Sequence, residues 1–451
     1  MKIQKQVPLT EGPILKSLTG LAVPIMISSF LGTLYNITDM AWIGLLGSKA
    51  VAAVGVGGMY VWLSQGLASL ARMGGQVHVA QCLGRGDKEQ AHRYAKTAVQ
   101  LSILLGLAFA AVSLLFTDPL VTFFKLEGVK TILDAKIYMR ITCGLILFSF
   151  LNLTLTGLYT AQGDSKTPFV ANFIGLLINL LLDPLLILGV GPFPRIEVAG
   201  AAVATVSAQL VVMLVMMVGV FRSKKEENVL KGIRLFEPFS KEELGNICKI
   251  GGPTAIQGMV YCMISMVLTR MVAAFGAEAI ATQRVGGQIE SVSWNTADGF
   301  AAALNAFVGQ NYGAKKMDRV QKGYRISFWT VAIWGALIML AFIIFPGPIA
   351  GVFFHEEKAM EIAISYLIII GFSEAFMCVE LMTIGALSGL GKTKLCSVIS
   401  ITATSMRIPL AMVLSRTSLG LDGIWWALTL TSVAKGIIFY LTFRYQMREK
   451  C

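Results

Sequence analysis

The chain has 451 residues, of which 55% are hydrophobic and 14% are charged. Soluble domains contain about 45–50% apolar and about 25% charged residues, so this composition excludes a soluble globular protein and indicates a polytopic membrane protein. The formal net charge of +12 does not indicate a nucleic-acid partner, because the Lys and Arg residues are concentrated in short segments between apolar runs. The lipid bilayer is the expected environment.

Twelve apolar runs follow one another between the charged segments, and a transmembrane helix needs about 20 such residues. Basic residues are densest in 85–96, 222–249 and 315–325, so the positive-inside rule places both termini in the cytoplasm. We therefore predict an all-α fold with twelve transmembrane helices, at residues 14–40, 50–79, 94–117, 131–158, 167–190, 198–221, 244–270, 279–308, 323–346, 360–385, 395–415 and 421–443.

Three polar residues, Tyr35, Asn36 and Asp39, lie in the first predicted span. Tyr35 and Asp39 are four residues apart and share a helix face, and Asn36 lies on the same side. Because Asp39 is near the end of this span, it could instead lie at the membrane interface. Trp42 follows it as a better marker of that interface and favours a carboxylate that faces a cavity.

A second acid, Asp183, lies in the fifth span beside Pro184, and Asn179 is one turn earlier on the same face. A charged side chain inside the membrane is costly and marks an ion or substrate path. Together with Thr205 of the sixth span, these residues and Asp39 could form one polar cluster. Two carboxylates in a low dielectric cannot both ionise cheaply, so the pair could share a proton. The alternative is a hydrogen-bonded patch that only fixes helix packing.

An internal repeat divides the chain into two halves. The halves share residues at one constant spacing, with Pro24, Gly47 and Val56-Gly57-Gly58 recurring as Pro253, Gly276 and Val285-Gly286-Gly287. Six spans in each half predict parallel repeats, which form two pseudo-symmetric six-helix bundles. We assign 1–221 to an N-terminal lobe, 222–243 to a cytoplasmic linker and 244–451 to a C-terminal lobe.

The two halves differ in their acids. Asp39 aligns with Leu268, and Asp183 aligns with Ile408 or Pro409, so both acids belong to the first half alone. This asymmetry places the expected chemistry in the N-terminal lobe. The second half has its own intramembrane acids, and we interpret them as ion pairs with Arg284, Arg407 or Lys435 and as cavity lining, or alternatively as a second cation site formed by Glu290, Asp298 and Glu374.

No metal site, cofactor or enzymatic activity is expected from the sequence. The seven cysteines and three histidines show no metal-ligand spacing. Residues 386–393 fit a relaxed phosphate-binding loop, but apolar spans flank them where such a loop needs a strand and a soluble helix. An ion gradient is therefore the expected energy source of a transporter.

These residues resemble the multidrug and toxic compound extrusion (MATE) family, and most of all its DinF-like branch in bacteria and archaea. The resemblance rests on motifs spread along nearly the whole chain, namely Thr10-Glu11-Gly12-Pro13-Ile14, Tyr35 to Asp39, Gly163-Asp164-Ser165-Lys166-Thr167-Pro168, Asn179 to Pro184, Gly191-Pro192-Phe193-Pro194, Val198 to Thr205 and Gly423 to Leu428.

The resemblance implies a V-shaped pair of six-helix bundles in the plasma (inner) membrane of a prokaryote. It implies export of small organic cations and drugs in exchange for H⁺ or Na⁺. It further implies that Asp39, Asp183, Asn179, Thr205 and Tyr35 form the site of exchange. One residue departs from the family: the NorM-type branch has a glutamate where this chain has Tyr261, so a second-lobe Na⁺ site of that kind is not expected. We expect a monomer.

Two other functions remain open at this point. A flippase for lipid-linked precursors would have a similar architecture and a more cationic cavity, for which the intramembrane residues Arg72, Arg140, Arg284, Arg407 and Lys435 are the support. An intramembrane hydrolase would use paired aspartates, but it does not require a two-fold repeat.

Overall fold

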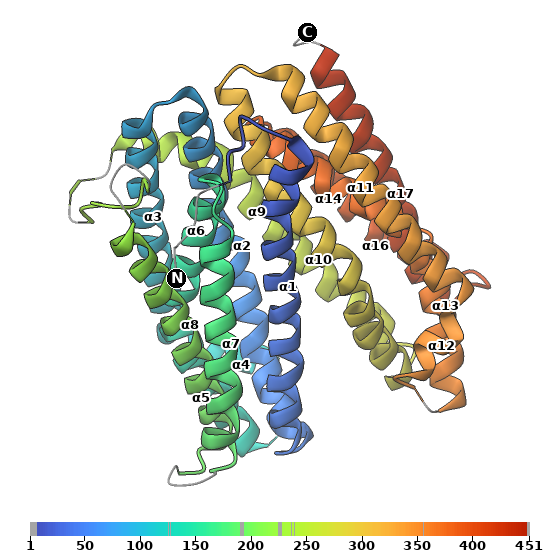
Figure 1. The fold of residues 1–451 in the computed structure, drawn as a ribbon. Coiled ribbons are helices and arrows are strands. Elements are labelled where there is room, and N and C mark those ends of the chain that lie inside the picture. Colours follow the sequence, from blue (N-terminus) through green and yellow to red (C-terminus); the bar gives the residue numbers. More distant parts are fainter. Residues whose placement is uncertain are drawn as a thin grey trace. The chain divides into compact units, whose positions relative to one another are not determined.

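The structure is a computed structural model that describes residues 7–124, 126, 128–189, 194–223, 228–235, 237, 238, 240–354 and 356–448. Within these ranges the chain forms α-helices joined by short turns, without strands (Figure 1). The predicted all-α fold class is confirmed. Residues 191–193, which belong to one motif of the family resemblance, lie outside the described residues.

The first half contains eight helices, of which α4 is a short one between two spans. Their bounds are α1 (Ile14–Gly44), α2 (Ser48–Arg85), α3 (Lys88–Leu115), α4 (Thr117–Thr122), α5 (Val129–Gly144), α6 (Leu147–Ala161), α7 (Lys166–Ile187) and α8 (Glu197–Arg222). Helices α5 and α6 form one span that bends by 43°.

The second half repeats this order, with two helices, α15 and α16, in the place of α7. Its helices are α9 (Lys241–Ala273), α10 (Ala277–Gly313), α11 (Met317–Ile344), α12 (Pro346–Gly351), α13 (Glu357–Gly371), α14 (Glu374–Gly389), α15 (Thr393–Ser405), α16 (Arg407–Leu414) and α17 (Leu421–Arg448). Helices α13 and α14 bend by 50°, at the place that corresponds to the bend between α5 and α6.

The turns before α2 and α10 show why the repeat keeps certain glycines. Gly47 and Gly276 occupy equivalent positions and have φ angles of 104° and 111°. Residues with a Cβ atom avoid this region, and glycine adopts it without steric cost. The turn at the other end of α2 uses Gly86 with φ of 81°, and the next residue, Asp87, caps α3 by accepting a hydrogen bond from the Gln90 amide at 2.9 Å.

The described helices provide up to eleven candidates for the twelve expected membrane spans. Nine helical segments are long and apolar enough to cross a membrane, and the two bent pairs raise the number to eleven. Helix α10 has 37 residues and takes the place of α2 in the second half, but it is less apolar. The chain is therefore a multi-pass membrane protein.

The chain divides into two compact units. The first unit comprises Met1–Val7 and Ile27–Gly258, and the second comprises Pro8–Met26 and Met259–Cys451. Helices α1 and α9, labelled in Figure 1, each contribute residues to both units. The lobe limits expected from the sequence, 1–221 and 244–451 with a linker at 222–243, stay a prediction.

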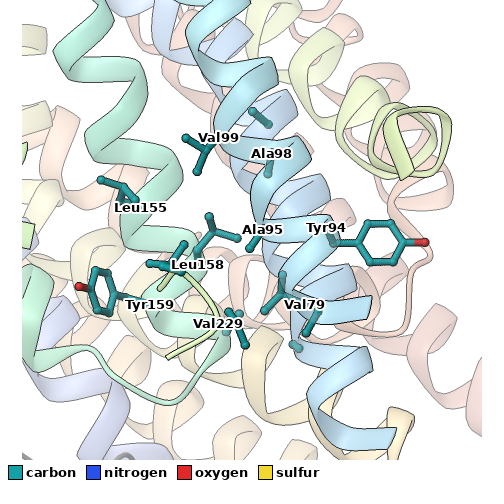
Figure 2. Close-up of a cluster of buried hydrophobic side chains, with 14 of the residues drawn as sticks. Val79, Tyr94, Ala95, Ala98, Val99, Leu155, Leu158, Tyr159 and Val229 are labelled. Atoms are coloured by element: carbon teal, nitrogen blue, oxygen red, sulfur yellow. The ribbon is translucent and has the colours of Figure 1, made fainter. Parts of the chain in front are cut away.

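The core of the first unit lies where α2, α3 and α6 meet. Ala95 and Ala98 of α3 and Leu158 of α6 are fully buried there, and Tyr159 packs beside them (Figure 2). Val229, from the segment after α8, completes this cluster. Small side chains on α3 let the helices approach closely, as is usual for helices that pack inside a membrane.

The segment from 228 to 238 is attached to the first unit by hydrogen bonds. The Val229 amide donates to Gln162 Oε1 at 3.0 Å, and Gln100 Nε2 donates to the Leu235 carbonyl at 2.9 Å. Lys96 Nζ lies 2.8 Å from Glu237 Oε2 and holds the pKa of that carboxyl below its ordinary value. The described part of the predicted linker therefore packs against α3 and α6.

Candidate functional site

Helix α7 supplies the amide and the acid predicted at its centre. Asn179 Nδ2 donates a hydrogen bond to Asp183 Oδ1 at 3.1 Å, as the four-residue spacing predicts. Asn179 is 1% exposed and Asp183 is 0% exposed. The other carboxylate oxygen, Asp183 Oδ2, has no hydrogen-bond partner among the described residues. Helix α7 continues through Pro184 to Ile187, so the proline does not end it.

Helix α1 brings the second carboxylate to the same place. Asp39 is 7% exposed, so its side chain is buried within the protein. Its Oδ1 atom has no hydrogen-bond partner within the described chain, and Asp39 and Asp183 are close enough to interact electrostatically. Tyr35, one turn before Asp39, is half-buried and interacts with both acids.

Thr205 on α8 and a tyrosine on α5 complete this cluster. The hydroxyl groups of Tyr35 and Tyr138 both approach Thr205, yet Thr205 Oγ1 makes no hydrogen bond of standard geometry with a described residue. Tyr138 is 6% exposed and interacts electrostatically with Asp39 and Asp183. We call the group of Tyr35, Asp39, Tyr138, Asn179, Asp183 and Thr205 the acidic cluster.

Asn36 is the one predicted member of this site that lies elsewhere. Its side chain is exposed, although it neighbours Tyr35 in the sequence. A helix turns by about 100° per residue, so adjacent side chains point to different sides. The structure brings together the other five predicted residues, and the functional role of each of them stays a prediction.

The acidic cluster can hold a positive charge. It contains two buried carboxylates, and neither forms an ion pair with a described basic residue. An isolated buried carboxylate is very costly in its ionised form, so it must bind a proton or another cation. Oxygen atoms without partners among the described residues, one on each acid and one on Thr205, are available to such a ligand.

The acids predicted in the second half lie on two helices of the second unit. Glu374, at the start of α14, is 0% exposed, and both of its carboxylate oxygens lack hydrogen-bond partners within the described residues. Glu290 on α10 accepts a hydrogen bond from the Tyr366 hydroxyl at 3.3 Å and is close enough to Glu374 to interact electrostatically. Asp298 is half-buried two turns further along α10.

Two buried basic residues of the second unit were predicted to form ion pairs with acids, and Lys435 does so whereas Arg407 does not. Lys435 Nζ lies 2.8 Å from Glu380 Oε1, and both side chains are 6% exposed. Arg407 was expected to pair with an acid, but it donates to Thr431 Oγ1 at 3.0 Å and to Ser432 Oγ at 2.9 Å. It acts on Glu290 only through its electric field. The reason is local: Thr431 and Ser432 on α17 lie directly against the start of α16.

A family model describes most of the helical part of this chain. The model named MatE matches residues 24–185 and 253–413, one match for each half. The chain belongs to the MatE family. The two matches also agree with the internal repeat of this MatE protein. Its assignment to the DinF-like branch stays a prediction.

Relatives of this MatE chain cover nearly its whole length. The "Probable multidrug resistance protein NorM" of Thermotoga maritima is 29% identical over 98% of this chain and 95% of that protein. The "Probable multidrug resistance protein YoeA" of Bacillus subtilis is 26% identical over 96% of this chain and 94% of that protein. A crystal structure of "MATE in the straight conformation" superimposes with a TM-score of 0.90 at 24% identity, covering 99% of each chain, and shows that the fold is the same.

The internal repeat contains a signal for the tyrosine that the sequence prediction missed. An added Cβ at Gly57 would lie 2.4 Å from the Tyr138 ring, and one at the equivalent Gly286 would lie 2.2 Å from the Tyr366 ring. In each half of this MatE protein, a tyrosine ring therefore packs against a glycine of the second helix. In each half the tyrosine contacts or faces an acid, so aligning tyrosines as well as glycines would have found Tyr138.

Proposed function

We propose that this protein is a secondary active antiporter that exports small organic compounds, mostly amphipathic cations, in exchange for H⁺ or Na⁺. The observation that carries the proposal is the acidic cluster. It holds two buried carboxylates, each with an oxygen that lacks a hydrogen-bond partner among the described residues. The names of the relatives as multidrug resistance proteins support the same class of cargo.

Exchange follows from the charge of the cluster. An empty, ionised pair of buried carboxylates is unfavourable, whereas a pair that holds a proton, Na⁺ or a cationic cargo is compensated. The proton or Na⁺ and the cargo then compete for one place, so arrival of one favours departure of the other. Tyr35, Tyr138 and Thr205 surround this place with hydroxyl groups that can donate to a carboxylate or accept from a cation.

The remaining parts of the proposal concern setting and partners. We place the protein in the plasma membrane of a prokaryote on the basis of its bacterial relatives, and both termini in the cytoplasm on the basis of the basic segments. It works there as a monomer, without a cofactor and without an enzymatic step, and the coupling ion is its only inorganic partner.

Transport in proteoliposomes tests this proposal. Asp39→Asn and Asp183→Asn each remove one carboxylate with little change in shape, so we expect each to abolish dye efflux driven by a pH or Na⁺ gradient. Asp118→Asn is the matched control, because Asp118 is an exposed acid of the same unit that pairs with Lys136 at 2.7 Å. Normal gradient-driven efflux by either variant of the cluster would rule out the mechanism. Gradient-independent movement of lipid-linked precursors would instead favour the flippase.

A further inference from the structure

Helix α11 of the second unit carries one exposed side along most of its length. Apolar side chains on this side lie three or four residues apart, so they share one face of the helix. Trp329, Arg325 and Lys322 continue the same spacing toward the start of α11 and are exposed too. The exposed apolar residues are Ile333, Leu337, Leu340 and Ile344. In a membrane this side presents an apolar stripe to the acyl chains, with a tryptophan and two basic groups at its end.

Helix α3 is the equivalent of α11 in the first unit, and there the same positions are covered. The repeat places Lys96 at the position of Arg325, and Gln100 at the position of Trp329. Lys96 Nζ lies 2.8 Å from Glu237 Oε2, and Gln100 Nε2 donates to the Glu237 carbonyl at 2.7 Å. Gln100 is 5% exposed, whereas Trp329 is 60% exposed. The segment after α8 thus covers this end of α3 and supplies a carboxylate, and no described residue supplies one to α11.

Aromatic rings join this end of α11 to α17, which is labelled beside it in Figure 1. The rings of Tyr324 and Phe443 are stacked with centroids 3.6 Å apart, and those of Phe328 and Tyr440 have centroids 5.1 Å apart. The Arg444 guanidinium lies over the Tyr440 ring, 5.8 Å from its centroid, and the side chain is exposed. Helix α17 therefore adds a third basic group to this surface.

The three basic groups have no acidic partner within the described chain. None of its ion pairs includes Lys322, Arg325 or Arg444. Asp318, one turn before Lys322, is exposed and forms no ion pair with a described residue. Basic residues beside a membrane attract anionic headgroups, a guanidinium binds phosphate through two parallel hydrogen bonds, and tryptophan is enriched at the membrane–water interface. The surface therefore matches the phosphate of a lipid headgroup.

We propose that the adjoining ends of α11 and α17 bind the headgroup of an anionic phospholipid, such as phosphatidylglycerol, through Lys322, Arg325 and Arg444. Its acyl chains lie along the apolar stripe of α11. The stripe continues from the basic groups at an unbroken spacing, which favours a lipid over a soluble phosphate. The lipid gives the second unit the negative charge that Glu237 gives the first. The proposed topology places this site in the cytoplasmic leaflet, and the inference is independent of the antiport.

Lipid binding to the full-length protein in a neutral detergent tests this assignment. The protein is titrated with phosphatidylglycerol or with phosphatidylcholine of the same acyl chains, and bound lipid is counted by native mass spectrometry. We expect Arg325→Gln to weaken phosphatidylglycerol binding about five-fold and Lys322→Gln with Arg325→Gln about 30-fold, because each basic residue near an anionic membrane surface contributes about a factor of five. Phosphatidylcholine binding should stay within about two-fold. Arg325→Lys keeps the charge and should bind phosphatidylglycerol nearly as the wild type does.

Arg93→Gln is the matched control, because Arg93 takes the position of Lys322 in α3 and is exposed, but lies 2.7 Å from Glu89. It should leave the affinity for both lipids unchanged. Equal affinity of the wild type for the two lipids, or an unchanged affinity for phosphatidylglycerol in the double variant, would overturn the inference. An equal loss in Arg93→Gln would also overturn it, since any basic surface would then bind the lipid. Displacement of phosphatidylglycerol by millimolar glycerol 3-phosphate would show a site for a soluble phosphate instead.

Discussion

The two units share a repeat but differ in the basic side chains that lie near their buried acids. In the first unit, Asp39 and Asp183 lie together, and no described basic side chain pairs with either. In the second unit, Glu380 pairs with Lys435 at 2.8 Å, and Glu290 lies in the field of Arg407. The second unit supplies a positive charge near Glu380 and Glu290, although not near Glu374, whereas the first unit supplies none to Asp39 or Asp183 among the described residues. The proposed function therefore has exchange in the first unit.

The largest expected effect comes from breaking the internal ion pair of the second unit. Glu380→Ala leaves Lys435 charged and buried without its carboxylate, and losing one member of a buried pair costs about 3–5 kcal/mol of stability. Asp183→Asn removes a charge that has no paired cation among the described residues and should cost less than about 1 kcal/mol. The free energies are compared from the thermal unfolding of purified variants.

A double variant separates charge from packing in this comparison. Glu380→Gln combined with Lys435→Met removes both charges at similar volume and should recover most of the stability that Glu380→Ala loses. If the double variant is as unstable as the single one, the pair contributes through packing, and the contrast between the units is not one of charge compensation.

The next largest effect is expected where a tyrosine ring packs against a glycine in each unit. Gly57→Ala and Gly286→Ala place a Cβ at 2.4 Å and 2.2 Å from the rings of Tyr138 and Tyr366, and overpacking of this kind costs about 1–3 kcal/mol. Both variants should melt earlier, but only Gly57→Ala should also reduce efflux, because Tyr138 belongs to the acidic cluster. Efflux rates are compared at equal amounts of folded protein.

The neighbouring glycines are matched controls. A Cβ at Gly58 or Gly287 would meet nothing within 4 Å, and replacing a helical glycine by alanine favours the helix. Gly58→Ala and Gly287→Ala should therefore keep or slightly raise stability and leave efflux unchanged. Equal loss of efflux in Gly57→Ala and Gly286→Ala would contradict the division of roles between the units.

A smaller effect is expected at Glu374, the remaining buried acid of the second unit. Both oxygens lack partners among the described residues and the residue is 0% exposed, a place where an ionised carboxylate would be very costly. Glu374→Gln should therefore change stability by less than about 1 kcal/mol and leave exchange intact. Loss of exchange in this variant would place a cation site in the second unit as well.

The smallest effect concerns the exposed ion pair of Lys96 and Glu237. Lys96 lowers the pKa of the Glu237 carboxyl. The stabilisation by this ion pair is therefore fully present at pH values above the ordinary pKa of glutamate, and it is lost as the pH falls through the lowered pKa. The protection factors of the amides of residues 229–235, which divide out the pH-dependent intrinsic exchange rate, should be the same at pH 7 and pH 6. Glu237→Gln should lower these protection factors slightly at both pH values, since Gln100 still donates to the Leu235 carbonyl. A large change between these two pH values would show that another group controls the segment.

Much of the fold and part of the site could be predicted from the sequence. Apolar runs predict membrane-spanning helices, and glycines that recur at one spacing predict the internal repeat. The four-residue spacing of Asn179 and Asp183 predicts their hydrogen bond. Side-chain direction and partner choice depend on other helices. The sequence therefore predicts Asn36 on the face of Asp39, whereas its side chain is exposed. It also predicts an acid as the partner of Arg407, whereas the guanidinium donates to hydroxyl groups of α17.

Substrate-induced proton movement in inverted membrane vesicles is the most direct test of whether Asp39 and Asp183 couple export to an ion gradient. Vesicles are energised to an acidic interior, a cationic dye substrate is added, and the loss of the pH gradient is followed in buffers with and without Na⁺. We expect the substrate to collapse the pH gradient, or an imposed Na⁺ gradient, through the wild type and the Glu374→Gln variant but not through Asp39→Asn or Asp183→Asn. If either aspartate variant collapsed the gradient as fast as the wild type, and only Glu374→Gln were inactive, the assignment of exchange to Asp39 and Asp183 would be wrong.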